Sequence, residues 1–526
     1  GLASWIAAPR ELRVAVAALR LGVSAARSKL RCGSFGGGPR TSALPRAPAP
    51  GRRPMPIMRL ALALAGATAA AASVARAPGK PIQGAWPMAY PAKEKCSKCG
   101  LCDTSFVSEV KEVCAFIEDG MSRLDTLEPA AHGRARRIQN DDGDLHDEAF
   151  FGVHERMVLA RAAPPVAGAQ WSGVATTIAR QMLLDGVVDA VVVTAAKEDD
   201  DLAPAPLLAR TPEEVLRGRG VKPSLSPALS ILDEVAADAS IKRLLFCGVG
   251  CSVQALRSLN GGDPEAALGL EAGGLFVMGT HCVDNSPTVE ANRGFLQALG
   301  ERPAEGAAAR YEFMADFQVH VDRADGTTSK SPYMVLPGTV AKASIAPSCL
   351  TCFDYVNGAA DLVVGYMGAP LNRGESMRNA LLQVTVRNPK GAAMLGRAER
   401  AGTVVIEADS RVAPLPTSGD RGKTAKATTQ ADSIVLEMLG EAVRDKGMPR
   451  PLAKVLAFVL RRVAPKGLEF AKYSIEYHFL RNDLASRDAW GTKRALSQMP
   501  AYAKAIVAQH DEWMDELRER IAAKRD

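Results

Sequence analysis

The spacing of hydrophobic positions predicts strands alternating with helices between residues 165 and 410. Apolar, β-branched runs at Val187–Val193 and Leu275–Met278 predict buried strands. The residues leading to Leu184, and the segment Ser252–Arg257, have the spacing of a helix. Because the two kinds of element alternate, this part of the chain is expected to form an α/β core.

The pattern differs on the C-terminal side of this core. Leucine and valine recur at helical spacing over Leu452–Val463, beside Arg461 and Arg462, which predicts an amphipathic helix. Its apolar face is expected to pack on the protein's own core, with a membrane surface or a partner subunit as the alternatives. Residues 410–440 predict a mobile connection, and Asp511–Asp526 predicts a charged, exposed helix.

Charge separates the first part of the chain from the rest. The 526 residues have a net charge of +7, but the first 93 hold 14 of the 65 Lys and Arg and one of the 58 acids. Residues 94–526 therefore have a net charge of −6, which argues against a nucleic-acid partner. The apolar run Leu60–Ala75, followed by a basic stretch to Lys93, predicts a signal-plus-transit leader that targets a complex plastid. No later stretch has the roughly 18 consecutive apolar residues of a membrane span.

The cysteines carry most of the chemical information. Cys96, Cys99 and Cys102 follow one another with two-residue spacers, which is how bacterial-type ferredoxins hold a 4Fe–4S cluster. Such a turn places three thiolates around one inorganic core. Zinc is the alternative, but zinc sites more often use separated cysteine pairs or add histidine. Cys349 and Cys352 form a second such pair.

The remaining cysteines indicate how the clusters are completed. The next cysteine, Cys114, is followed by Ala115 and not by the proline of two-cluster ferredoxins, so the local motif cannot close a ferredoxin domain alone. Cys251 and Cys282 are each expected to begin a loop after an apolar strand, and Cys247 to be buried as a small hydrophobe. Eight thiolates, enough for two 4Fe–4S clusters, are the expected ligands: Cys96, Cys99, Cys102, Cys114, Cys251, Cys282, Cys349 and Cys352. Which four hold which cluster stays open.

A cofactor that pairs single electrons is also expected, because clusters carry electrons one at a time. Gly248-Val249-Gly250 begins like a dinucleotide fingerprint, but Val253 replaces its third glycine, which disfavours a pyridine-nucleotide site. The small and hydroxylated residues of Trp171–Thr177 at a helix start suit a phosphate. Val221–Pro227 adds a lysine and two hydroxyls in a rigid loop. Each segment is also compatible with a plain capped helix or a structural turn.

Six segments together carry a family resemblance: Cys96–Thr104, Phe151–Glu155, Gln170–Gly173, Leu245–Arg257, Ala346–Tyr355 and Pro465–Ser474. They resemble the plant and cyanobacterial branch of the beta-subunit family of deazaflavin-reducing hydrogenases, over roughly residues 90–510. The resemblance implies FAD, two 4Fe–4S clusters, ferredoxin as electron donor and a chlorophyll-type pigment as substrate. It leaves open contact with a thylakoid surface and a homo-oligomer.

Two activities are known in that branch. One reduces the 7-hydroxymethyl group of a chlorophyll to methyl, and the other reduces the 8-vinyl group of chlorophyll precursors. The long insertion Gly368–Asn388 resembles the first type, which we therefore expect, whereas Asp354–Asn357 and Met367–Pro370 resemble the second type equally well. An electron-transfer subunit without enzymatic activity is the alternative of another class.

The resemblance also places candidate site residues. FAD is expected near eight residues: Trp171, Ser172, Gly173, Thr176, Thr177, Lys222, Ser224 and Ser226. The reduction needs a proton donor. Four residues beside the cluster cysteines are candidates for it, or for hydrogen bonds around the ligands: His281, Asp284, Asp354 and Tyr355.

The expected fold class is α/β (α+β), with a cysteine-rich, ferredoxin-like N-terminal segment on an α/β flavin-binding core and a helical C-terminal extension. The expected boundaries are a targeting leader over 1–90, an iron–sulfur segment over 91–160, an N-terminal flavin domain over 161–265, a C-terminal domain with the second cysteine pair over 266–410, and a linker with the helical extension over 411–526.

Overall fold

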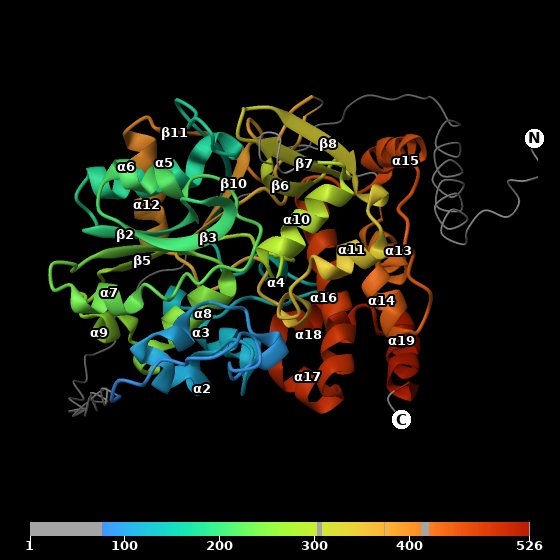
Figure 1. Ribbon diagram of the computed structural model, residues 1–526, viewed down its shortest axis with the longest axis horizontal. Coiled ribbons are helices and arrows are strands. Elements are labelled where there is room, and N and C mark those ends of the chain that lie inside the picture. The colour runs from blue at the N-terminus through green and yellow to red at the C-terminus, as the bar shows by residue number, and fades with distance from the viewer. Residues whose placement is uncertain (1–75, 302–307, 373, 412–419, 525–526) are drawn as a thin grey trace, which may run out of the picture. The chain divides into compact units, whose positions relative to one another are not determined.

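The computed structural model describes residues 76–301, 308–372, 374–411 and 420–524. The apolar run Leu60–Ala75 and most of the expected leader lie outside these residues. Within them, eight strands form a mixed sheet in the order β11-β1-β10-β9-β5-β4-β2-β3, and three form a second sheet in the order β6-β7-β8 (Figure 1). The strands of the large sheet are β1 (Arg156–Ala162), β2 (Ala190–Lys197), β3 (Asp200–Ala209), β4 (Leu244–Gly248), β5 (Leu275–Thr280), β9 (Leu362–Gly365), β10 (Leu382–Val386) and β11 (Val404–Asp409).

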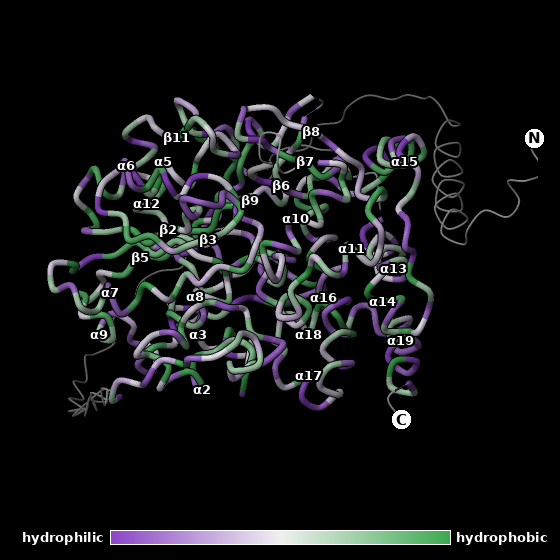
Figure 2. The backbone as a smooth tube through the Cα atoms, in the orientation of Figure 1, coloured by the Kyte–Doolittle hydropathy of each residue, from purple (hydrophilic) through white to green (hydrophobic). Residues whose placement is uncertain are grey.

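The centre of the large sheet is parallel. Strands β2, β4, β5 and β9 pair in parallel, and β3, β10, β1 and β11 continue the sheet on both sides by antiparallel pairing. Parallel strands covered on both faces have continuous hydrophobic sequences, and the strands around β2 and β5 show this in Figure 2. The expected α/β core is confirmed, although the first expected strand begins at Ala190 instead of Val187.

Each face of the large sheet has its own hydrophobic core because side chains alternate along a strand. Val191 and Val193 of β2 pack with α5 (Val174–Leu184) and α12 (Pro389–Arg400). Ala190 and Val192 pack with α8 (Gly250–Ser258), the N-terminal segment and the C-terminal helices. The cysteine-rich N-terminal segment therefore lies against the face that carries α8, as Figure 1 shows.

The C-terminal helices extend this second core. They are α13 (Arg421–Ala431), α14 (Ser433–Met438), α16 (Leu468–Trp490), α17 (Thr492–Gln498), α18 (Ala501–Ala508) and α19 (Asp511–Ala523). Helix α16 is central, because α13, α14, α17, α18 and α19 all pack on it. The expected mobile connection over 410–440 is therefore wrong for residues 421–438, where Ala425, Thr429 and Val435 are fully buried. Residues 412–419 of that stretch lie outside the described residues.

The second sheet consists of β6 (Ala308–Met314), β7 (Gln318–Arg323) and β8 (Thr328–Pro332). Helices α10 (Val289–Ala298) and α15 (Arg450–Val463) pack beside it. The amphipathic helix expected over Leu452–Val463 exists, but small residues, Ala453 and Ala457, form its buried face, while Val455 and Phe458 are 61% and 59% exposed. Among the described residues, no helix combines the length and hydrophobicity needed to cross a membrane.

Candidate redox site

Four of the expected thiols lie around a small cavity in the N-terminal segment. Cys96, Cys99, Cys102 and Cys114 line this space of about 30 Å³. We call these four residues the outer thiol set. Its loop turns tightly at Gly100, which has a φ of +90° and no room for a side chain, because a Cβ there would lie 2.8 Å from the backbone nitrogen of Ser230.

The other four expected thiols border a much larger cavity of about 330 Å³. Cys251, Cys282, Cys349 and Cys352 line it and form what we call the inner thiol set. Cys282 follows β5, and Cys349 begins the short turn Cys349–Thr351. Cys251 lies in the first turn of α8, not in the loop that was expected, and it borders both cavities. Cys247, near the C-terminal end of β4, also lines the larger cavity.

The surroundings of the thiols favour their neutral form. Burial raises the pKa of Cys102 and Cys349 to about 12, and the pKa of Cys114 to about 11. All nine described cysteines are free thiols. Because thiolates are the form that binds metal, loading either set would release protons and depend on pH.

Neither set has the spacing of a mononuclear site. In the part of the chain that the structure describes, no three His, Cys, Asp or Glu side chains approach one another closely enough to hold a single metal ion. Tetrahedral zinc, with Zn–S bonds of about 2.3 Å, would bring its sulfurs to within about 3.8 Å of each other. The eight thiols line the two cavities. Their role as ligands remains a prediction.

Six of the eight residues expected near FAD line the larger cavity: Trp171, Gly173, Thr176, Lys222, Ser224 and Ser226. The other two do not line it. The Ser172 hydroxyl accepts a hydrogen bond from the Ala162 backbone at 2.8 Å and donates to the Trp171 carbonyl at 2.7 Å. Thr177 is buried one position beyond Thr176, and consecutive residues of a helix point in different directions.

Several features of this cavity suit a flavin dinucleotide. The Trp171 indole nitrogen and the Ser226 hydroxyl are buried without a hydrogen-bond partner. Helix α5 starts after Gly173, and no side chain caps it. Its first backbone N–H groups therefore receive no hydrogen-bond acceptor from a capping side chain. Lys222 donates to the carbonyls of Gly218 and Arg219 at 2.9 and 3.0 Å. Burial, with the charges of Arg310 and Arg219, lowers the pKa of Lys222 to about 7. Phosphate groups would relieve this concentration of positive charge.

The four candidate proton donors all line the larger cavity. Two of them, Asp284 and Asp354, are held by other groups of the protein. Burial would raise the pKa of Asp284, yet the Arg481 guanidinium and His478 hold it well below its usual range. Asp354 accepts hydrogen bonds from the Gly358 backbone at 2.7 Å and the Gln254 amide at 3.0 Å. Burial lowers the pKa of His281 to about 3, so that its ring is neutral.

Tyr355 is the fourth candidate, and it is also buried. Burial raises the pKa of its hydroxyl, which lies 3.5 Å from the Ser474 hydroxyl. The position of all four residues at the cavity agrees with the expectation.

The sequence reasoning missed a group on helix α16. Arg481 donates two hydrogen bonds to Asp284, and Asn482 donates to the backbone carbonyls of Cys349 and Cys352 at 2.9 and 2.7 Å. His478 lines the cavity as well. These polar residues share one helical face, with spacings of three and four. That spacing was the signal available in the sequence, but it does not reveal what the face contacts.

Two further cavity residues were missed, Glu312 on β6 and Tyr366 after β9. The ring of Tyr366 stacks on that of Trp171, with centroids 5.2 Å apart and planes inclined by 1°. The Tyr366 hydroxyl hydrogen-bonds to Glu312. Glu312 comes from the second sheet, so no local pattern connects it with the cysteines.

Comparison with known proteins places this site in a family. Two family models match, the N-terminal part of the coenzyme F420 hydrogenase/dehydrogenase beta subunit over residues 157–233 and its C-terminal part over residues 241–411. A chloroplastic 7-hydroxymethyl chlorophyll a reductase of rice, Oryza sativa subsp. japonica, is 47% identical over 80% of this chain and 84% of its own length.

Two further relatives extend the comparison. An uncharacterized protein of the cyanobacterium Nostoc is 41% identical over 80% of this chain and 94% of its own length. The coenzyme F420 hydrogenase beta subunit of Methanosarcina barkeri is 28% identical over 43% of this chain and 74% of its own length. Fold, site and relatives define the class as an oxidoreductase with a mixed α/β core. The chain belongs to the coenzyme F420 hydrogenase/dehydrogenase beta-subunit family.

Proposed function

We propose that this protein is a plastid reductase that converts 7-hydroxymethyl chlorophyll a to chlorophyll a with electrons from ferredoxin. One observation carries the proposal. The inner thiol set opens into the same cavity of about 330 Å³ as Trp171 and Lys222, so a one-electron carrier and a two-electron cofactor would share one space. The 47% identity to the rice reductase supports the choice of substrate.

The cofactors that this function needs are two 4Fe–4S clusters and FAD. The outer set would hold one cluster and the inner set the other, since each offers four cysteines around its own cavity. The buried, unpaired polar atoms of Trp171 and Ser226, together with Lys222, support FAD binding. A flavin supplies the pairing of single electrons that clusters lack.

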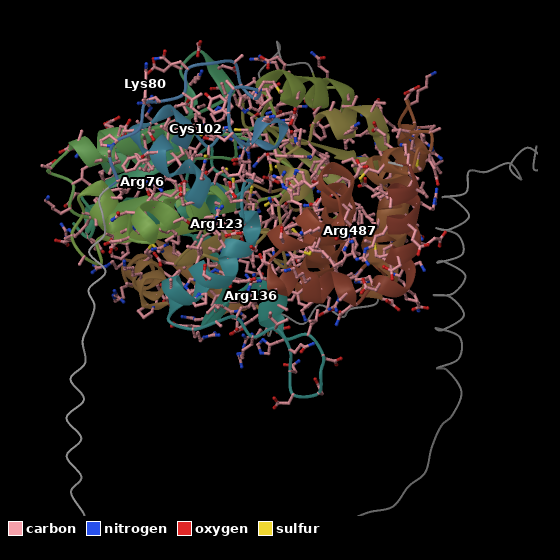
Figure 3. The ribbon with its side chains drawn as sticks, turned by 90° about the horizontal axis from the view of Figure 1, so that it is seen from below. Arg76, Lys80, Cys102, Arg123, Arg136 and Arg487 are labelled. Atoms are coloured by element: carbon pink, nitrogen blue, oxygen red, sulfur yellow. The ribbon has the colours of Figure 1, made fainter. Side chains whose placement is uncertain are left out.

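The proposed site of electron uptake is the surface around the outer thiol set. Cys96 and Cys102 retain some exposure there. Arg76–Cys102 contains five basic residues and one acid, Glu94. Arg76 is paired with Glu112 at 2.7 Å, which leaves four lysines, and Lys80 lies on the same segment as Cys102 (Figure 3). Lys98 lies over the Trp86 ring at 5.0 Å, and Met88, two residues further along the chain from Trp86, is 61% exposed. A basic surface with an apolar centre suits an acidic electron carrier such as ferredoxin.

The proposed contact with a membrane is helix α15. Val455, Phe458 and Val463 are 61%, 59% and 46% exposed, and the sequence Arg450–Val463 contains four basic residues and no acid. An exposed apolar face edged by cations is typical of helices that lie on anionic lipid. Two copies of this chain meeting through the same face would bring like charges together, which favours lipid over self-association. A pigment substrate would then be taken up from the lipid surface on which the protein rests.

The test is turnover by the purified chain reconstituted with iron, sulfide and FAD. Reduced ferredoxin is supplied with 7-hydroxymethyl chlorophyll a and, separately, with an 8-vinyl chlorophyll precursor. We expect product only from the first substrate. Product only from the second would assign vinyl reduction, and electron transfer without either product would assign a non-enzymatic subunit. The last two outcomes each contradict the proposal.

A further inference from the structure

Among the carboxylic acids that line the larger cavity, Glu312 stands apart. Asp284 is held by Arg481, and Asp354 is held by Gln254 and the Gly358 backbone. Within the described residues Glu312 forms no ion pair with any basic side chain, so its charge is not compensated. Its strand β6 belongs to the second sheet, which brings this one acid to a cavity otherwise built by the large sheet and α16.

Glu312 is connected to the expected flavin position through two rings. The Tyr366 hydroxyl hydrogen-bonds to the Glu312 carboxyl, and the Tyr366 ring stacks on Trp171 at 5.2 Å with an angle of 1°. The stacking fixes the direction of the Tyr366 hydroxyl. The carboxyl is thereby held in one orientation at the wall of the cavity.

The surroundings of Glu312 allow its carboxyl to carry a proton near neutral pH. Burial raises its pKa to about 7, against a lowering by the Tyr366 hydroxyl and the Phe313 backbone. The other titratable groups that sense its charge are the hydroxyls of Tyr311, Tyr333 and Tyr355, whose pKa values all lie above the usual range of tyrosine. None of these phenols titrates near pH 7. Lys222, which lines the same cavity, also has a pKa of about 7, so the pH profile is measured at saturating FAD, where a change in FAD affinity does not limit turnover.

We infer that Glu312 is the proton donor of the reaction and that Tyr366 is its positioning residue. This inference rests on the proposed function. In the reduction of 7-hydroxymethyl to methyl, the C–O bond breaks, the carbon gains a hydrogen, and the oxygen leaves as water. The balance needs two electrons, which ferredoxin supplies in two single transfers, and two protons. Glu312 would give one proton to the departing hydroxyl and then be reprotonated from solvent. The second proton, also from solvent, would reach the carbon together with the electron pair.

Protonated Glu312 is the active form in this scheme, which fixes the sign of the pH dependence. Turnover should be full below the pKa of Glu312 and fall as the pH rises through about 7. Glu312→Gln should lower kcat by about 10²- to 10⁴-fold, the usual contribution of a general acid, and remove this limb of the pH profile. Glu312→Asp should retain the fall in turnover with rising pH, but with a lower kcat.

Tyr366→Phe separates positioning from donation. Loss of the Tyr366 hydroxyl removes a hydrogen bond that favours the charged carboxylate, so the limb should move to higher pH while kcat falls only modestly. A matched control is Glu476→Gln. Burial also raises the pKa of Glu476 to about 7, but this residue pairs with Arg421 and does not line the cavity. The control should leave the pH profile unchanged.

A second readout does not depend on turnover. Infrared difference spectra of the wild-type protein between pH 6 and pH 8 should contain the carbonyl band of a protonated carboxyl that Glu312→Gln removes and Glu476→Gln retains. Absence of this band, or an unchanged pH limb in Glu312→Gln when the wild type is active, overturns the inference and leaves the function intact. An inactive wild type that still shows the Glu312 band contradicts the proposed function instead.

Discussion

Arg481 and Asp284 form a two-point ion pair, at 2.7 and 2.8 Å, between helix α16 and the loop that carries Cys282. The Arg481 side chain is 1% exposed and that of Asp284 is 20% exposed. The neighbouring Asn482 holds the carbonyls of Cys349 and Cys352. Helix α16 therefore holds the segments that carry three of the four inner thiols, although it contributes no cysteine itself.

Removal of Arg481 tests this support. Arg481→Ala leaves Asp284 without its partner, and losing one member of a buried pair costs about 3–5 kcal/mol of unfolding free energy. We expect a lower midpoint in chemical denaturation and loss of the inner cluster, hence about half of the bound iron. Arg397→Ala breaks an exposed pair with Asp185 and should cost about 0–1 kcal/mol. Full iron content in Arg481→Ala would contradict the assignment.

Single cysteine substitutions test the division into two sets. Cys99→Ser should remove the outer cluster and Cys352→Ser the inner one, each lowering the iron content from about eight atoms to about four. Cys247→Ser is the matched control, because Cys247 lines the cavity outside the expected ligand set. Iron analysis and electron paramagnetic resonance of the reduced protein provide the measurement. Iron loss in Cys247→Ser to the same extent would require a different ligand set.

Lys222 tests the flavin site. Lys222→Met removes a charged hydrogen-bond donor, worth about 1.5–3 kcal/mol, so the Kd for FAD should rise by about 10- to 100-fold. The pKa of Lys222 is lowered to about 7 by burial and by Arg310 and Arg219. Its positive charge is lost as the pH rises through that value, and FAD should bind more weakly at pH 8 than at pH 6. Fluorescence titration measures both effects.

The control for Lys222 is Lys390→Met. Lys390 pairs with Glu265 at 3.2 Å and lies away from the cavity. It should leave FAD affinity and its pH dependence unchanged. Equal affinity of wild type and Lys222→Met at both pH values would exclude Lys222 from the flavin site.

The basic surface near the outer thiols is tested by charge reversal. Lys80→Glu combined with Lys98→Glu should raise the KM for ferredoxin by about tenfold at low salt and flatten its dependence on ionic strength. The pair Lys342→Glu and Lys423→Glu changes the same charge elsewhere on the surface and should have no such effect. A rise in KM that is equal in both double variants would show that only net charge matters.

Helix α15 is tested with lipid vesicles. Val455→Ser combined with Phe458→Ser should weaken binding to anionic vesicles by at least about tenfold, since each buried apolar side chain contributes about 1.5–3 kcal/mol. Leu184→Ser, at a 60% exposed leucine on α5, is the control. Co-sedimentation measures binding, and sizing chromatography detects self-association. Undiminished vesicle binding, or a dimer that the double variant dissociates, would contradict the lipid assignment.

The sequence predicted what depends on local pattern and failed where distant segments meet. The strands ending at Cys247 and Met278 were expected because their apolar runs are continuous. The grouping of Cys251 with Cys349 was not, because it depends on strand order and on α16. The stretch around Ala425 was predicted to be a mobile connection, because small residues are common both in linkers and where two helices pack closely.

The same limit applies within the site. The spacing of Cys96, Cys99 and Cys102 predicts a cluster site, and these three residues line one cavity, whereas Glu312 belongs to no sequence motif. Ser172 and Thr177 were expected at the flavin because hydroxyls suit phosphate, but the backbone turn directs one toward β1 and the helix directs the other into the core. On α15, the large apolar residues were expected to be buried. Instead the small residues Ala453 and Ala457 are buried against the protein, while Val455 and Phe458 are exposed.

Cys251 stands in a wall that both cavities share, at the start of α8. Neither cavity is fully enclosed until β4, α8 and the N-terminal segment have met. Retention of the proposed clusters would thereby depend on folding of the chain at least through α8, and a chain cut after the outer cysteines would lack part of the enclosure. The proposed outer cluster should therefore be retained only when the chain through α8 has folded, and the proposed inner cluster only when α16 has also packed.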